Sequence, residues 1–150
     1  KSADFKAHET RGNKKILEIL GLYFSSNRTD RLKAPPIIIT KTIKLNGKTG
    51  YREFIGLGLI NQSPTLVQQY EKSSNKVFSN YQFEVTLIDL QPEDEFDWQW
   101  IDDRRNEKLN DVEASKRAPK NWLKWIDSGN EIASQIQLKI KAYRLVSETD

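Results

Sequence analysis

The residues that could perform chemistry in this chain of 150 residues are few. It contains one histidine, His8, and no cysteine, so it cannot assemble a two-histidine metal site, a thiolate site or a cysteine nucleophile by itself. Asp102 and Asp103 are residues of the type that bind magnesium. Adjacent carboxylates on a helix point in different directions, however, and Arg104-Arg105 follows at once. We therefore favour a local ion-pair cluster, and we expect neither a metal nor a cofactor.

Two further motifs of catalytic chemistry are incomplete. The segment 111–116 (DVEASK) lacks the Glu-x-Lys spacing of a nuclease metal site. The pair Gly56 and Gly58 lies within a predicted strand and no helix follows it, so it is not a phosphate-binding loop. The sequence therefore predicts that this domain is not an autonomous enzyme.

Recognition of a polyanion fits the sequence better than catalysis does. Residues 1–60 hold 12 Lys and Arg against 5 Asp and Glu, whereas residues 61–112 hold 5 against 11. Four aromatic residues lie among or after the cations of the basic half: Tyr51, Phe54, Tyr70 and Tyr81. Bases stack on aromatic faces and phosphates pair with Lys and Arg, so this composition suits nucleic acid. An unevenly charged, solvated surface is the alternative.

The aromatic residues also have a structural interpretation. Aromatic side chains at strand spacing usually belong to a core, and we predict this for three of them: Phe54, Phe78 and Phe83. Trp122 and Trp125 lie three residues apart on one predicted helical face, where their indoles would seal the open side of a sheet. For Trp98 and Trp100, sealing the sheet and stacking on bases both stay open.

The first half of the chain is predicted to be rich in strands. After residues 1–13, which we expect to be flexible, the apolar stripe of residues 14–24 predicts an amphipathic helix. β-branched and apolar runs then predict a meander of four or more strands, at residues 37–45, 51–60, 65–70 and 78–90. Asn46-Gly47 predicts the first hairpin turn. Gly56 and Gly58 indicate a bulge, or a place where another backbone or a ligand comes close.

The second half is predicted to be mostly helical, with helices near residues 96–106, 111–118, 119–129 and 131–147. We therefore expect one α+β domain, with a curved antiparallel sheet or small β-barrel flanked by helices. No stretch resembles a membrane span or signal peptide, so we expect a cytoplasmic protein. Methionine is absent, which indicates a piece excised from a longer protein.

Four segments carry a resemblance to a known family: 54–60 (FIGLGLI), 78–85 (FSNYQFEV), 97–105 (DWQWIDDRR) and 118–125 (APKNWLKW). Within residues 50–130 they resemble the SRA-like target-recognition domain of modification-dependent (type IV) restriction endonucleases, of the AspBHI N-terminal and SauUSI types. The resemblance implies an SRA-like barrel that binds double-stranded DNA containing 5-methylcytosine or 5-hydroxymethylcytosine. It also implies that the modified base is flipped into an aromatic pocket, and that nuclease or helicase domains of the same chain are the partners.

From the base-binding role that the resemblance implies, and from the charge pattern, we expect two sets of site residues. The base-binding set comprises Tyr70, Tyr81, Ser73, Asn75, Asn80, Gly56 and Gly58, with the two tyrosines sandwiching the base. The set expected to contact the DNA backbone comprises Lys41, Lys44, Lys48, Arg52, Arg104 and Arg105. For Arg104 and Arg105 an ion pair with Asp102 or Asp103 is the alternative. The hairpin tip at residues 46–50, or the loop at residues 61–64, would enter a groove and replace the extruded base.

The loop between the tyrosines departs from the family pattern. It offers Ser73, Ser74 and Asn75, where the SRA pattern has an aspartate that holds the cytosine amino group. Glu71, Asn80 or an acid from elsewhere would take that role, or the pocket is built differently.

Three other functions stay open. An RNA- or single-strand-binding barrel would stack unpaired bases on exposed aromatic rings. A protein-interaction module would use the Trp-rich helices as its docking face. An enzyme would use Asp102 and Asp103 as magnesium ligands.

Overall fold

The computed structural model describes residues 11–91 and 96–139. Its helices are α1 (Arg11–Tyr23), α2 (Arg28–Lys33), α3 (Gln99–Arg105), α4 (Asp111–Ala114), α5 (Lys120–Ser128), the 3-10 helix η3 (Asn130–Ile132) and α6 (Ala133–Ile136). Its strands are β1 (Ile37–Leu45), β2 (Lys48–Leu59), β3 (Thr65–Glu71), β4 (Lys76–Gln82) and β5 (Thr86–Leu87). No helix of the described part is long and apolar enough to cross a membrane.

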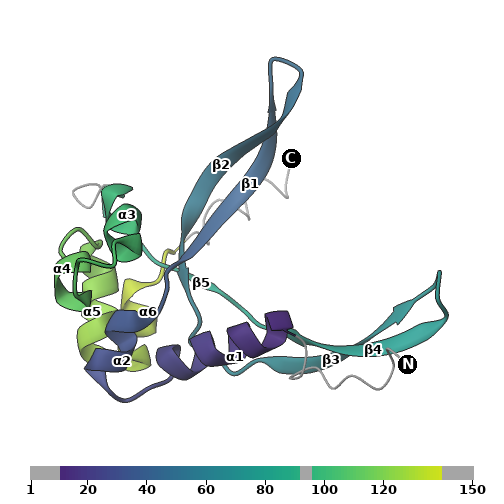
Figure 1. Cartoon of the computed structure of the whole chain (residues 1–150), viewed down its shortest axis with the longest axis horizontal. Coiled ribbons are helices and arrows are strands. Elements are labelled where there is room, and N and C mark those ends of the chain that lie inside the picture. Colours follow the sequence, from purple (N-terminus) through teal and green to yellow (C-terminus); the bar gives the residue numbers. More distant parts are fainter. Residues whose placement is uncertain (1–10, 92–95, 140–150) are drawn as a thin grey trace.

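The strands form two antiparallel sheets, one with the order β1-β2-β5 and one with the pair β3-β4. Two long ribbons, β1–β2 and β3–β4, project in different directions from a helical body (Figure 1). The predicted α+β class with antiparallel strands is confirmed. The barrel alternative is wrong for the described residues, because no pair of strands closes either sheet.

The predicted single meander is also wrong. β2 pairs with the short strand β5 through Gly58↔Leu87 and Leu59↔Thr86, so β5 occupies the edge that β3 would need. The predicted strand at residues 78–90 is split for the same reason. Its first part pairs with β3, and its second part returns to β2.

The β1–β2 hairpin forms as predicted. Asn46 and Gly47 both have positive φ angles, 51° and 75°, as a type I′ turn requires. Further down, Ile39 pairs with Gly56 and Thr40 with Phe54, so Ile55 is an extra residue in β2. The predicted bulge is therefore present, directly before Gly56.

The β1–β2 ribbon is buried only near the helical body. In β2 the segment 56–59 is fully buried, whereas residues 48–53 are exposed. Leu57 and Leu59 of this segment belong to the same buried cluster as three of the tryptophans. Trp100, Trp122 and Trp125 are each 0% exposed, which confirms the sealing role predicted for Trp122 and Trp125 and extends it to Trp100.

The three phenylalanines predicted to be core residues differ in outcome. Phe83 packs against the core, and the half-buried Phe54 packs against Phe96 with ring centroids 5.1 Å apart. Phe78 is 41% exposed, and the prediction was wrong there. Phe78 lies opposite Gln69 in the two-stranded ribbon, and among the described residues it does not belong to the hydrophobic core.

The two ends of the domain also differ from the predictions. Residues 11–13, expected to be flexible, belong to α1, and residues 1–10, with His8, lie outside the described residues. The predicted helix at 131–147 ends at Ile136. Gln137 is extended and forms a bridge with Ile88, and residues 140–147 lie outside the described residues.

We expect Gly58→Ala to destabilise the fold. A Cβ atom on Gly58 would lie 2.1 Å from Cγ1 of Val85, a stiff β-branched side chain, and such overpacking costs about 1–3 kcal/mol. Gly21→Ala in α1 is the control, because its Cβ would meet nothing within 4 Å and should stabilise by up to about 1 kcal/mol. Urea unfolding measures both variants. Equal stability of Gly58→Ala and the wild type would contradict close packing at this position.

Candidate nucleic-acid interface

The outer part of the β1–β2 ribbon is strongly cationic. The strand register puts Lys41 on one face of the ribbon, and puts Arg52 and Thr42 together on the other face. Four basic side chains of this ribbon are exposed: Lys41, Lys44, Lys48 and Arg52. Glu53 is the one carboxylate in β1 and β2. The ribbon therefore presents positive charge on both faces, which suits contact with phosphates.

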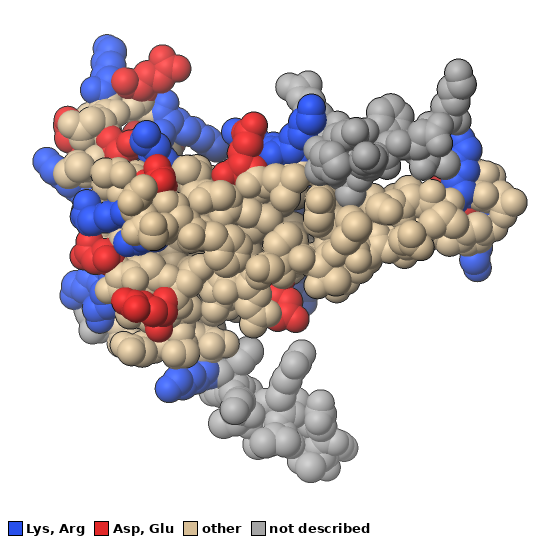
Figure 2. All heavy atoms as spheres, turned by 90° about the horizontal axis from the view of Figure 1, so that it is seen from below, with Lys and Arg blue, Asp and Glu red and all other residues tan. Residues whose placement is uncertain are grey.

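The β3–β4 ribbon is different in chemistry. Figure 2 shows this arm, at the right, with few charged side chains away from its tip. Charges within residues 65–82 occur only at Glu71, Lys72 and Lys76, all near the turn. Several apolar side chains are exposed along the ribbon: Leu66, Tyr70, Val77 and Phe78.

The ribbon does not bring Tyr70 and Tyr81 together. Tyr70 pairs with Val77, and Tyr81 pairs with Leu66, so both rings share one face but lie four residue positions apart, about 13 Å. A base held between two rings needs them only about 7 Å apart, two van der Waals contacts of about 3.5 Å. The predicted sandwich of one base between both tyrosines is therefore wrong for this conformation.

The polar residues that were predicted to surround the base instead form hydrogen bonds within the turn between β3 and β4. The Tyr70 hydroxyl donates to Oδ1 of Asn75, which has a positive φ of 54°. Glu71 accepts hydrogen bonds from Ser74, at 2.7 Å, and Ser73, at 3.2 Å. The hydrogen bond from Ser74, and to a smaller extent the one from Ser73, lowers the pKa of Glu71. Most of this polar set is therefore engaged within the turn.

Asn80 and the two glycines lie away from the tip. Oδ1 of Asn80 accepts a hydrogen bond from the backbone N–H of Tyr81 at 2.9 Å. Gly56 and Gly58 are buried, and their missing side chains leave room for Leu87 and Val85. The bulge directly before Gly56 and the close approach of residues 85–87 are therefore both present.

Arg104 and Arg105 also have separate roles. Arg104 donates to the backbone carbonyls of Leu32, at 3.3 Å, and Lys33, at 3.1 Å, so it satisfies the C-terminal end of α2. Burial lowers the pKa of Arg104, although Tyr23 and Asp111 partly offset this. Arg105 is exposed and has no hydrogen bond or ion pair with another described residue.

The ion pair predicted between the adjacent acids and arginines is wrong in its partners. Asp103 accepts from Arg117, at 2.7 Å, and from Gln99, at 3.1 Å. Arg117 reaches it because the loop after α4 returns to α3. Asp102 is exposed beside it. The described residues contain no cluster of three or more His, Cys, Asp or Glu that could hold a metal ion.

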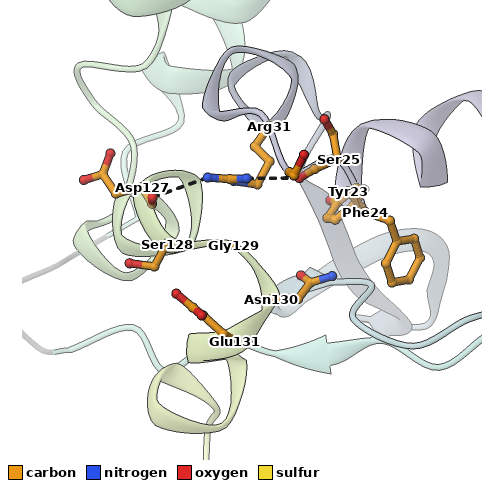
Figure 3. Close-up of a pocket in the computed structure, with 10 residues that line it drawn as sticks. Tyr23, Phe24, Ser25, Arg31, Asp127, Ser128, Gly129, Asn130 and Glu131 are labelled. Carbon is orange, nitrogen blue, oxygen red and sulfur yellow. Dashed lines mark hydrogen bonds between the residues drawn. The ribbon is translucent and has the colours of Figure 1, made fainter.

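A hollow of about 520 Å³ lies between the end of α1, α2 and the end of α5 (Figure 3). The buried Arg31 forms part of its lining and donates to the carbonyls of Ile126, at 2.8 Å, and Ser25, at 3.0 Å. Asp127 and Glu131 add carboxylates to the lining. Since Arg31 is engaged and the other charges are negative, this hollow does not suit a phosphate.

Trp98 is an exposed aromatic residue for which the sequence left two interpretations open. It is 53% exposed, whereas Trp100 is fully buried. Residues two apart on a helix point to nearly opposite sides, because each residue turns by about 100°. The spacing was therefore a usable signal that one indole is buried and the other is not.

Comparison with known proteins agrees with the resemblance predicted from the sequence. The family described as restriction endonuclease AspBHI N-terminal matches residues 1–137. The chain belongs to this family. A solved structure, described as the MspJI restriction endonuclease in complex with a 27-mer oligonucleotide, matches with a TM-score of 0.77 and 29% identity. It covers 88% of this chain, and the chain spans 30% of the MspJI chain. No curated protein matches.

We expect the Asp103 cluster of this AspBHI-type domain to stabilise the fold in a pH-dependent way. Hydrogen bonds from Gln99 and Arg117 lower the pKa of Asp103 below the unfolded value of about 3.9. The folded state therefore binds this proton less readily than the unfolded state. The stabilisation is present above that value and is lost as the pH falls through the lower folded pKa.

Thermal unfolding of Asp103→Asn tests this. The difference in melting temperature from the wild type should be largest between about pH 5 and 7, and should shrink below about pH 4. Asp102→Asn removes the exposed neighbouring carboxylate and should melt close to the wild type. A difference for Asp103→Asn that stays constant down to pH 3 would contradict the ionised cluster.

Proposed function

We propose that this domain binds double-stranded DNA that contains 5-methylcytosine or 5-hydroxymethylcytosine, and directs a separate nuclease domain to it. The observation that carries the proposal is the exposed cationic β1–β2 ribbon, on a chain that belongs to a restriction endonuclease family. The match to MspJI, whose structure holds an oligonucleotide, supports DNA as the partner. The described fold contributes a rigid base for this ribbon.

The shape of the ribbon suits a DNA groove. β1 has nine residues, about 30 Å of strand, and the major groove accepts a two-stranded ribbon. Because cations lie on both faces, the ribbon can contact phosphates on both sides of a groove. In this arrangement the hairpin tip at residues 46–50 points into the duplex.

The β3–β4 ribbon would form a second contact. Tyr70 is 57% exposed near its tip, and Tyr81 is half-buried nearer the body. We assign to them separate stacking surfaces, because their spacing does not allow a sandwich. Extrusion of the modified base from the helix is part of the proposal, since a modification is read most directly when the base has left the stack.

Cleavage is assigned to a part of the protein beyond this domain. The chain aligns with only 30% of the MspJI chain, which leaves room for a nuclease domain there. In the present domain the acids of α3 are divided between a salt bridge and an exposed position. That arrangement favours a structural role for Asp103 over a catalytic one.

Binding to matched duplexes with cytosine, 5-methylcytosine or 5-hydroxymethylcytosine tests the proposal. We expect tighter binding to at least one modified duplex, measured by fluorescence anisotropy at moderate salt. Equal affinity for all three duplexes would contradict modified-base recognition. Tighter binding to single strands than to duplexes would favour a single-strand-binding protein. A wild type that discriminates, with Tyr81→Ala unchanged, would remove only Tyr81 from the site.

The ribbon itself is tested by its salt dependence. Lys44→Ala combined with Lys48→Ala should reduce the slope of log K against log salt by about 1.8, since each phosphate contact contributes about 0.9. Lys124→Ala, an exposed lysine of α5, is the control and should leave the slope unchanged. If the double variant and the control have the same slope, the β1–β2 ribbon does not contact the DNA phosphates.

A further inference from the structure

The tip of the β1–β2 ribbon carries a side chain that can react with its own backbone. Asn46 is the one asparagine of the sequence that precedes a glycine, Gly47. In such a pair the backbone nitrogen of the glycine can attack the side-chain amide carbon of the asparagine, because glycine has no Cβ to obstruct the approach. In a folded protein the reaction depends on how exposed the turn is, how readily it opens and what holds the asparagine side chain.

No other described part of the chain covers this turn. Asn46 and Gly47 are both exposed, and a Cβ atom placed on Gly47 would meet no heavy atom within 4 Å. The turn lies at the free end of the ribbon, away from the helical body (Figure 1). The side chain of Asn46 has no hydrogen-bond partner among the described residues. Its amide group is therefore free to rotate and is accessible to water.

The strand ladder is irregular next to the turn. Ile43 pairs with Tyr51 and Leu45 pairs with Lys48, so two steps along β1 correspond to three steps along β2. Gly50 lies within this irregularity and has a φ of 102°. The turn is therefore joined to the rest of the ladder through the single pair Leu45 and Lys48. Segments with so few contacts open locally at a low cost in free energy, and the attack needs such opening because the Asn46 backbone has to rotate.

The other hairpin tip provides a comparison within the same chain. Asn75 is also exposed, and its φ of 54° is close to the 51° of Asn46. Oδ1 of Asn75, however, accepts a hydrogen bond from the Tyr70 hydroxyl. The residue after it is Lys76, whose side chain hinders approach to the backbone nitrogen. The two asparagines therefore share a backbone conformation and differ in the two features that control the reaction.

The lysines beside Asn46 favour the reaction and make its product important. Lys44 and Lys48 are exposed and lie two residues to either side. Positive charge nearby stabilises the oxyanion that forms when the nitrogen adds to the amide carbon. The product carries a carboxylate, which cancels one of the two positive charges that these lysines supply. An isoaspartate would also lengthen the main chain in a two-residue turn, whose geometry depends on loop length.

We propose that Asn46 converts spontaneously to aspartate and isoaspartate, and that this conversion weakens the contact between the β1–β2 ribbon and DNA. A bond forms between the Gly47 nitrogen and Cγ of Asn46, the bond from Cγ to Nδ2 breaks, and ammonia leaves with the Gly47 amide proton. Water then opens the cyclic imide at one of its two carbonyls. No oxidant or reductant is needed. The conversion itself is independent of the proposed function, and only its effect on binding rests on that function.

Peptide mapping of the aged domain tests the conversion. Trypsin cleaves after lysine, so residues 45–48 and residues 73–76 give separate peptides, one for each tip. During weeks at mildly alkaline pH, we expect the first peptide to gain the mass that replacement of an amide by a carboxyl group adds. An isoaspartate-specific methyltransferase should label part of it. The peptide with Asn75 should stay unchanged over the same period. Conversion of Asn46 that is no faster than that of Asn75 would overturn the proposal.

Lys76→Gly separates the effect of the following residue from the effect of the hydrogen bond. This variant places Asn75 before a glycine while Tyr70 still holds its side chain, so Asn75 should convert more slowly than Asn46. Adding Tyr70→Phe should then accelerate the conversion of Asn75. Equal rates at both tips of the single variant would contradict the role assigned to the free side chain of Asn46. Thermal unfolding shows whether each variant keeps its fold.

Fluorescence anisotropy with a DNA duplex tests the effect on binding. Asn46→Asp, which makes one of the two products, should weaken binding about 1.5- to 5-fold at moderate salt, the range for one exposed charge interaction. The difference should shrink as salt is raised. Aged wild type should bind more weakly than fresh wild type. Asn46→Gly, which suits the same turn and has no side-chain amide, should bind equally well before and after ageing.

The outcomes distinguish this proposal from the proposed function. Fully converted protein that binds as tightly as fresh protein would overturn the weakening, while DNA binding itself stays intact. A loss of affinity on ageing that is equally large in Asn46→Gly would also overturn it, because that loss has another origin. The absence of DNA binding by fresh protein would overturn the proposed function, and the effect of the conversion on binding with it. Peptide mapping decides the conversion of Asn46 in every case.

Discussion

A continuous cluster of aromatic rings forms the centre of this domain's core. It runs from the buried Tyr23 through the indoles of α5 and α3 to Phe54 and the exposed Trp98, with successive centroids about 5–6 Å apart. Such pairs stabilise beyond the area that they bury. The Tyr23 hydroxyl donates to the carbonyl of Pro35 at 2.5 Å, so a hydrogen bond also connects the aromatic cluster to the segment that leads into β1. Burial raises the pKa of Tyr23 well above its ordinary value, which keeps that donor protonated.

The packed core explains how a small domain can carry two exposed ribbons. A two-stranded hairpin is marginally stable in water, so each ribbon needs an anchor at one end. For β1–β2 the anchor is the buried segment 56–59, where glycines let β5 pack closely. The free end can then carry repelling cations, because its stability does not depend on its own surface. For β3–β4, the hydrogen bonds that Asn75 and Glu71 accept within the turn limit fraying at the free end.

The buried Arg31 and the half-buried Arg104 complete the ends of two short helices. α2 has six residues and α5 has nine, and the last carbonyls of such helices lack intrahelical partners. Arg104 and Arg31 donate to carbonyls at these two ends. Basic residues that would count as DNA-binding by composition are therefore part of the framework. The exposed cations of the β1–β2 ribbon and Arg105 take no part in these helix ends.

The sequence by itself determined the local elements, the family and the separation of a basic strand region from a helical cap. Those features depend on neighbours in the chain: the Asn46-Gly47 turn, the helix stop at Gly129 and the stripe of α1. Tertiary structure alone decided which strand pairs with β2, how far apart Tyr70 and Tyr81 lie, and which partner Asp103 takes. Alternation cannot distinguish one continuous strand from two that belong to different sheets, and charge cannot show which arginines bind carbonyls. The same limit applied to Trp98 and Trp100, whose opposite environments follow from where α3 begins and from what packs against it.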